Sequence, residues 1–182
     1  MEGVEIAVQA ASEDEAGLVE RLRHFEERAW NEIYDTYFPR LFRYLYLQTS
    51  SQEVAEELTS QVFEEACNRI GTYRYRGSPL SAWLYRVAHN RMVDWRRKRK
   101  ELPLVDGDSQ PDMADRVADR DEIATAMREL TPEQQQVLIL RHVEGHTSAS
   151  AGGIMGKSAG AVRSLEFRAL ATLRRSVSEP RK

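Results

Sequence analysis

Four residues near the C-terminus have side chains that can read the edges of DNA bases. At about 100° per residue, they share one arc of roughly 140° on a helix over 158–175: Arg163, Ser164, Phe167 and Arg168. The opposite side is apolar: Val162, Leu165, Ala169 and Leu173. Arginine pairs bidentately with guanine, serine bonds to either edge, and phenylalanine contacts a thymine methyl. We therefore predict that this face enters the major groove of duplex DNA.

Two preceding helices must hold this reading helix in place. Thr131 predicts the start of the first, because it is a cap residue followed directly by proline. We expect Thr147–Met155 to form a short support helix, Gly156 to form a turn, and Ser158 to cap the reading helix. This order of elements predicts a helix-turn-helix domain.

A second candidate surface for nucleic acid lies in residues 75–100. Ser78 followed by Pro79 predicts a helix start. The buried side of that helix is expected to hold Leu84, Val87, Ala88, Met92 and Trp95. A narrow stripe away from it holds Arg86, Asn90 and Arg97. Five consecutive cations, 96–100, end the helix; because five exceed what the helix dipole requires, phosphate contact is the better interpretation.

The N-terminal half also has helical periodicity. Ser12 with Glu15 has the spacing of a capping box, and apolar residues continue at helical spacing up to Pro39, which we expect to interrupt the helix. Ser50 with Glu53 predicts the start of a further helix. That helix carries five acids: Glu53, Glu56, Glu57, Glu64 and Glu65. Taken alone, an acidic surface of this kind is most often simply solvated.

The charge distribution divides the chain into modules. A net charge of -3 over 182 residues hides +3 in 24–100, -6 in 101–122 and +4 in 123–182. Residues 101–116 combine prolines, a glycine and aspartates with few large apolar residues, which predicts a flexible acidic linker. No strand is predicted. The expected all-α organisation is an N-terminal extension, two small helical domains and the linker between them: 1–16, 17–100, 117–178 and 101–116.

Composition disfavours several locations and activities. No apolar run can span a bilayer, no secretory signal is visible, and the single cysteine, Cys67, permits no internal disulfide, so we predict a cytoplasmic protein without membrane insertion. His142 and His146 flank Glu144 at a metal-like spacing, but no third strong ligand stands nearby and Gly145 is expected to end the helix. No metal, cofactor or enzyme activity is predicted, because paired carboxylates, phosphate-cradling glycine loops and activated nucleophiles are also missing.

Three segments, in order, resemble extracytoplasmic-function sigma factors, the small two-domain class of bacterial transcription initiation factors in the sigma-70 superfamily. They are Ala55–Phe63, Tyr75–Asn90 with Asp94 and the basic run, and Leu130–Glu144 with Gly156–Leu173. Together they cover about residues 25 to 176. The resemblance implies a region 2 helical bundle and a region 4 helix-turn-helix joined by the acidic linker.

The resemblance also implies partners and sites. The acidic helix would dock on the clamp helices of the largest subunit of core RNA polymerase, with the flap as a further contact, through Glu56, Glu57, Ser60 and Gln61. The minus 10 promoter element would be opened and bound by Tyr75, Arg76, Gly77, Ser78, Trp83, Arg86, Asn90 and Arg97. The reading face at Arg163, Ser164, Phe167 and Arg168 would bind the minus 35 element as duplex. An anti-sigma factor is an expected partner.

The sequence departs from the family pattern in the support helix. Ser150 and Ala151 replace the usual acid and large aliphatic, and Gly152 and Gly153 follow. Because glycine costs about 1 kcal/mol relative to alanine in a helix interior, we expect a weak support helix. A separate hypothesis concerns the linker, whose aspartates are expected to lie along the basic channel for nascent RNA until RNA displaces them: Asp106, Asp108, Asp112 and Asp115.

Two other function classes are less consistent with the sequence. A stand-alone helix-turn-helix regulator with a dimerising or sensing domain would bind a palindromic duplex tightly without polymerase. It would not need the tryptophan-bearing helix that starts near Pro79, with its basic end. A nucleic-acid enzyme lacks a recognisable catalytic constellation. The sequence therefore favours a promoter-specificity subunit.

Overall fold

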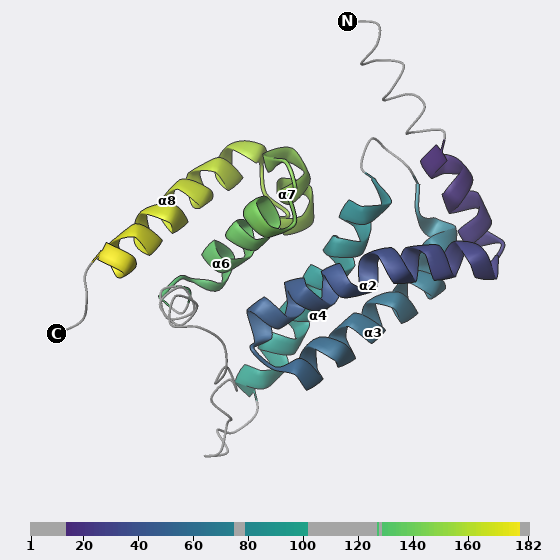
Figure 1. The fold of residues 1–182 in the computed structure, drawn as a ribbon, viewed down its shortest axis with the longest axis horizontal. Helices are drawn as coiled ribbons and strands as arrows, with labels where there is room; N and C mark the ends of the chain where they lie inside the picture. Colours follow the sequence, from purple (N-terminus) through teal and green to yellow (C-terminus); the bar gives the residue numbers. More distant parts are fainter. Residues whose placement is uncertain (1–13, 75–78, 102–126, 128, 179–182) are drawn as a thin grey trace, which may run out of the picture.

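The computed structural model describes residues 14–74, 79–101, 127 and 129–178, and within them every regular element is helical (Figure 1), which confirms the all-α prediction. Tyr75, Arg76, Gly77 and Ser78, the linker aspartates and the Ser12 cap lie outside the described residues. The helices after a short N-terminal helical segment, 14–23, are α2 (Glu27–Thr49), α3 (Gln52–Arg69), α4 (Leu80–Glu101), α6 (Pro132–Leu138), α7 (Ser148–Met155) and α8 (Ala159–Ser178).

An N-terminal bundle is formed by segment 14–23 with α2, α3 and α4. Both α2 and α4 pack against α3 and contact one another, and the expected apolar side of α4 is buried at Leu84, Val87, Ala88 and Met92. The cap of α3 lies one residue later than predicted. Ser50 takes a left-handed conformation, φ 54°, at the end of α2, so Ser51 caps α3 and accepts a hydrogen bond from the Val54 amide at 3.4 Å.

The first predicted helix is broken in a different place. The chain turns at Phe25, whose φ of 55° is left-handed, whereas Pro39 lies inside α2. A proline inside a helix removes one hydrogen bond and crowds the carbonyl of the preceding turn, at a cost of about 3 kcal/mol or more, but α2 buries Ile33 before Pro39 and Leu41 after it. We infer that this packing on both sides of Pro39 keeps the helix continuous.

The C-terminal domain, 129–178, has the predicted helix-turn-helix order. Thr131 and Gln134 form a full capping box at the start of α6, with hydrogen bonds of 3.3 and 2.9 Å. Thr147 caps α7 and Ser158 caps α8, each through the amide three residues on, both at 3.1 Å. Gly156 provides the left-handed turn with φ 67°. Instead of continuing as α-helix towards Gly145, α6 leads into a π-helical turn, Ile139–Val143.

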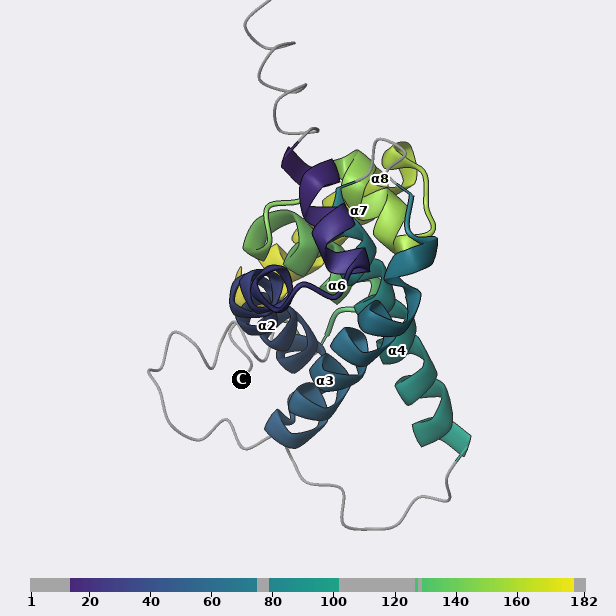
Figure 2. The same cartoon turned by 90° about the vertical axis from the view of Figure 1, so that its right-hand side faces the viewer.

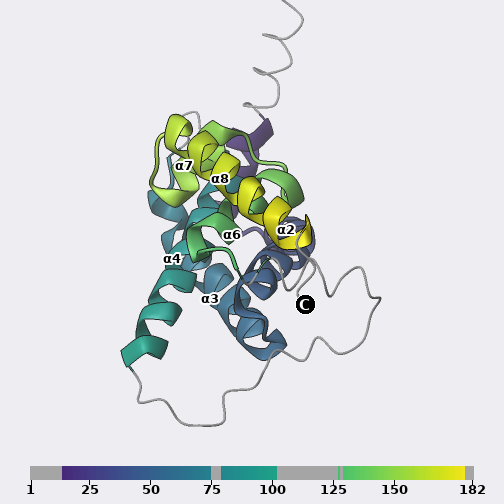
Figure 3. The same ribbon diagram turned by 90° about the vertical axis from the view of Figure 1, so that its left-hand side faces the viewer.

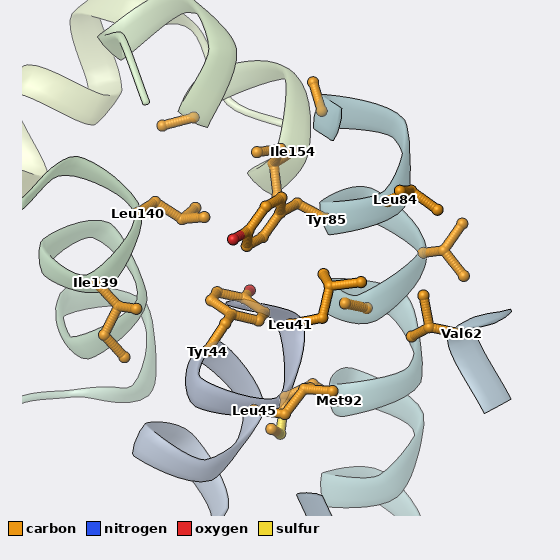
Figure 4. Close-up of a cluster of buried hydrophobic side chains, with 14 of the residues drawn as sticks. Leu41, Tyr44, Leu45, Val62, Leu84, Tyr85, Met92, Ile139, Leu140 and Ile154 are labelled. Atoms are coloured by element: carbon orange, nitrogen blue, oxygen red, sulfur yellow. The ribbon is translucent and has the colours of Figure 1, made fainter. Parts of the chain in front are cut away.

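The two modules pack against one another. Figures 2 and 3 show α6, α7 and α8 on one side of the N-terminal bundle, and α7 contacts α4 while α6 contacts α2. Figure 4 shows that one apolar cluster crosses the boundary, with Leu140 and Ile154 facing Tyr85 and Tyr44. The structure therefore has a continuous core between modules that the sequence divides by charge.

Candidate nucleic-acid and polymerase interfaces

The reading face of α8 is open to solvent. Arg163, Ser164, Phe167 and Arg168 are all exposed, and the Phe167 residue is 73% exposed. Behind them Val162, Leu165 and Ala169 are buried, as the helical periodicity predicted. The structure thus brings the four residues together on one face, and an exposed phenylalanine among arginines suits contact with base edges rather than packing.

Glu166 has a structural role that the sequence did not reveal. Its carboxylate lies 3.2 Å from the Arg141 guanidinium and 2.9 Å from His142 Nε2. These contacts fasten α8 to the π-helical turn and turn Glu166 inward, with only 14% of its side chain exposed. His142 therefore contacts a carboxylate, and among the described residues no group of three or more potential ligands could hold a metal ion.

The two glycines of α7 occupy different environments. A Cβ added to Gly152 would lie 2.5 Å from the Lys157 carbonyl oxygen, across the tight turn. A Cβ added to Gly153 would meet only the end of the Arg86 side chain, at 3.5 Å. The expectation of a weak support helix considered only helix propensity, whereas Gly152 is required by the close approach of backbone to backbone.

The described part of the second surface lies along α4. Arg86, Asn90 and Arg97 are exposed, and the Arg97 guanidinium pairs with Asp94 at 3.0 Å. Trp83 is half-buried, with its ring centroid 5.3 Å from that of Tyr73. The α4 residues form a polar stripe with one aromatic ring near the start of the helix, as a surface for unstacked single-stranded DNA requires.

Trp95 lies near the basic end of α4. It is half-buried against the core, with the Arg99 guanidinium 5.3 Å from the ring centroid. The sequence predicted that Trp95 is buried in the core; the structure places it at the edge of the core, half-buried. Its ring also forms a cation–π contact with Arg99.

The acidic face of α3 is exposed and internally ordered. Glu56, Glu57 and Ser60 are exposed and Gln61 is half-buried. The Gln61 amide donates to Glu57 at 3.0 Å, and the Gln52 amide donates to Glu56 at 2.9 Å. Within the part of the chain that the structure describes, neither Glu56 nor Glu57 forms an ion pair with a cation, so both carboxylates can meet a basic partner surface.

Glu144 joins the two modules, which the sequence did not predict. Its side chain is 0% exposed and lies between Arg40 and Arg43 of α2. The Tyr85 hydroxyl of α4 donates to the same carboxylate. Burial raises the pKa of Tyr85, and the hydrogen bond to Glu144 and its negative charge raise it further. The π-helical turn brings Glu144 to this position, because the Glu144 amide bonds to the Ile139 carbonyl at 2.9 Å.

A second polar contact crosses the boundary beside it. The Gln136 side-chain amide of α6 donates to the Tyr44 hydroxyl at 2.8 Å and lies 2.6 Å from His89 Nδ1 of α4. Burial raises the pKa of Tyr44 to about 12 and lowers the pKa of His89, which Arg96 lowers further. The interface therefore contains neutral tyrosine and histidine, which can be desolvated at lower cost than charges.

Comparisons with known proteins match this architecture module by module. The family model described as sigma-70 region 2 matches residues 33–101, and the model described as sigma-70, region 4 matches residues 126–175. A curated relative, the ECF RNA polymerase sigma factor BldN of Streptomyces coelicolor, is 34% identical over 168 residues, which cover 87% of this chain and 64% of BldN. The chain belongs to the extracytoplasmic-function sigma factors.

Two further sigma factors match most of this chain. The ECF RNA polymerase sigma factor SigX of Bacillus subtilis is 27% identical, with 82% of this chain and 84% of SigX covered. The sigma factor RpoE of Bartonella quintana, solved in complex with the anti-sigma factor NepR, superposes with a TM-score of 0.66 at 22% identity. That match covers 83% of this chain and 98% of the other. In the part of this sigma factor that the structure describes, no helix is long and apolar enough to cross a membrane.

Proposed function

We propose that this sigma factor binds core RNA polymerase and directs it to promoters with minus 10 and minus 35 elements, without catalytic chemistry of its own. The observation that carries the proposal is the solvent-exposed face of α8, where Phe167 stands between Arg163 and Arg168 on a capped helix-turn-helix. Within the family whose region 4 model matches here, this helix is the natural reader of duplex DNA.

Each module has its own proposed role. Residues 17–100 would contact core polymerase and the minus 10 element, residues 117–178 would contact the minus 35 element, and 101–116 would connect them after an extension over 1–16. The minus 10 contacts are assigned to Trp83, Arg86, Asn90 and Arg97, with Tyr75, Arg76, Gly77 and Ser78 in the preceding loop. The exposure of the α4 stripe supports this assignment.

An anti-sigma factor is proposed as a further partner, and this sigma factor is proposed to act in the cytoplasm. The support comes from the relative RpoE, which was solved with the anti-sigma factor NepR and shares the fold. Binding of such a partner to surfaces needed for polymerase would hold this sigma factor inactive.

The test of the function is reconstitution with bacterial core polymerase and a library of random upstream sequences. We expect transcription to start at a defined pair of sequence motifs. Tight binding of a palindromic duplex by the isolated chain, without any effect on polymerase, would instead identify a stand-alone regulator. The promoter selected in this way then serves as the template for every other DNA experiment.

Reversing the charge of the acidic α3 face should weaken assembly with polymerase. In the double variant Glu56→Lys and Glu57→Lys, we expect association with core polymerase to slow about tenfold or more at low salt, because complementary charge mainly sets the rate of encounter. The association rates of the parent chain and the variant with surface-immobilised core polymerase are measured at two salt concentrations.

The matched control reverses two exposed acids elsewhere, Asp14→Lys and Glu27→Lys, with the same change in net charge. It should leave the association rate near that of the parent chain. Equal slowing in both double variants would show that net charge, rather than the α3 face, controls assembly.

The acidic linker is proposed to act after binding. Replacing Asp106, Asp108, Asp112 and Asp115 with asparagine should change the ratio of abortive to full-length transcripts, because the linker would lose its attraction to the RNA channel. The ratio is measured on the selected promoter. An unchanged ratio and unchanged promoter escape would refute this role.

A further inference from the structure

The carboxylate of Glu144 sits in a cradle built entirely from region 2. Arg43 approaches one oxygen with its Nη2 and Nε at 2.7 and 3.0 Å, and Arg40 Nε lies 3.4 Å from the other. The Tyr85 hydroxyl donates to that second oxygen. Two guanidinium groups and one phenol, all donors, therefore converge on one oxyanion whose side chain has no solvent exposure.

This donor set suits a phosphate as well as a carboxylate. Guanidinium groups bind both oxyanions through charge-assisted hydrogen bonds, often with two donors on one anion. The two arginines remain partly exposed, at 43% and 51% of their side chains, although their donors point at Glu144. If the C-terminal module moves away and takes Glu144 with it, these donors are left open to another oxyanion.

Glu144 has to leave if the proposed function is correct. The minus 10 and minus 35 elements are separated by about 25 base pairs, or about 85 Å of duplex. In the structure α7 packs directly on α4, and the Arg86 guanidinium of the minus 10 stripe is 3.5 Å from the position of a Cβ on Gly153. Region 2 and region 4 cannot occupy both elements in this closed arrangement, so they must separate, and the cradle then loses its anion.

The cradle adjoins the proposed DNA-binding stripe. Tyr85 precedes Arg86 on α4, and Arg40 and Arg43 lie on α2, which packs beside α4. We infer that Arg40, Arg43 and Tyr85 form an additional binding site for a backbone phosphate of promoter DNA, and that Glu144 occupies this site in the closed form. The inference rests on the proposed function, because it needs a promoter-bound chain.

Removing the arginines and removing the Glu144 carboxylate should have opposite effects on DNA binding. Two variants are compared: the double variant Arg40→Gln, Arg43→Gln, and the single variant Glu144→Gln. Each is used as the full chain, assembled with core polymerase on the selected promoter. The arginine double variant should bind the promoter more weakly, and the slope of log affinity against log salt should fall by about 1, because the contact to one phosphate is lost. Assembled with core polymerase, Glu144→Gln should leave that slope unchanged. In a separate measurement without polymerase, the Glu144→Gln chain should bind the promoter duplex more tightly than the parent chain.

Two controls separate the phosphate site from loss of folding or of charge. Arg21 has the same side-chain exposure as Arg40, 43%, and forms two ion pairs within the N-terminal bundle. Arg21→Gln should therefore keep the parent slope. The triple variant at Arg40, Arg43 and Glu144 leaves no buried carboxylate without a partner, and should show the same reduced slope as the double variant.

An unchanged salt slope in both arginine variants would overturn the phosphate site and leave only a contact between modules. So would promoter affinities that move in the same direction when either side of the ion pair is removed. If the parent chain with core polymerase selects no promoter at all, the proposed function fails first, and the phosphate site fails with it.

Discussion

Alanine at Gly152 is expected to destabilise region 4 by about 1 to 3 kcal/mol, as an overpacked site does. The added Cβ would lie 2.5 Å from the Lys157 carbonyl oxygen, which is a backbone atom in the turn between α7 and α8. That turn is already fixed by the left-handed Gly156, φ 67°, and by the Lys157 amide, which donates to the Gly152 carbonyl at 2.8 Å. Relief of the clash would have to move α8 relative to α7.

Alanine at the neighbouring Gly153 is the matched control, with the opposite expected sign. Its Cβ would meet only the Arg86 side-chain end at 3.5 Å, which is ordinary contact. The better helix propensity of alanine should then stabilise α7 by up to about 1 kcal/mol. Urea unfolding of the full chain, followed by circular dichroism, measures both as shifts of the midpoint at constant slope. Two shifts of the same sign would show that the turn is looser than this geometry implies.

The helix-turn-helix itself was largely predictable, because its signals are local. The Thr131 capping box, the Thr147 and Ser158 caps and the Gly156 turn each depend on residues within three or four positions. The faces of α4 and α8 were predictable for the same reason, since helical periodicity sorts apolar from polar residues wherever a helix exists. These features confirm the expected positions of Phe167 and its neighbours.

Features that depend on distant contacts could not be predicted in this way. Pro39 is a strong local signal for a break, yet burial on both sides of it prevails, and the break falls at Phe25. Glu144 drew attention only as a residue between two histidines, whereas its partners on α2 are 101 and 104 residues away. A buried carboxylate needs such partners, but no pattern in one sequence identifies them.

Gly152 shows how a local rule and a tertiary requirement can point in opposite directions. Helix propensity counts each glycine as a loss, so the pair 152–153 predicted a weak support helix. The structure separates the two residues, because only Gly152 faces a backbone atom across a tight turn. The buried Ile154 and Met155 then anchor α7 against the rest of the chain. The stability of this helix therefore depends on packing more than on its intrinsic propensity.

Replacing Arg168 with alanine should weaken promoter use through the minus 35 element by about 1 to 3 kcal/mol, the usual contribution of one bidentate contact between arginine and guanine. Arg168 is exposed on α8, and its Nε lies 3.4 Å from the Ser164 carbonyl, which holds the stem along the reading face. The measurement compares initiation by the variant and the parent on the selected promoter. A matched template carries a scrambled minus 35 element.

A loss confined to the intact element assigns Arg168 to minus 35 recognition, whereas an equal loss on both templates would contradict that assignment. Arg168→Lys then distinguishes the two ways an arginine can contribute. Lysine keeps the positive charge but lacks the planar pair of donors. If Arg168 contacts a phosphate, Arg168→Lys should therefore restore the binding that Arg168→Ala loses; if Arg168 reads a base, Arg168→Lys should not restore it. We expect little restoration, because Arg168 shares its face with the exposed Phe167. The apolar ring of Phe167 suits contact with base edges and not with phosphates, which indicates that this face lies against the bases.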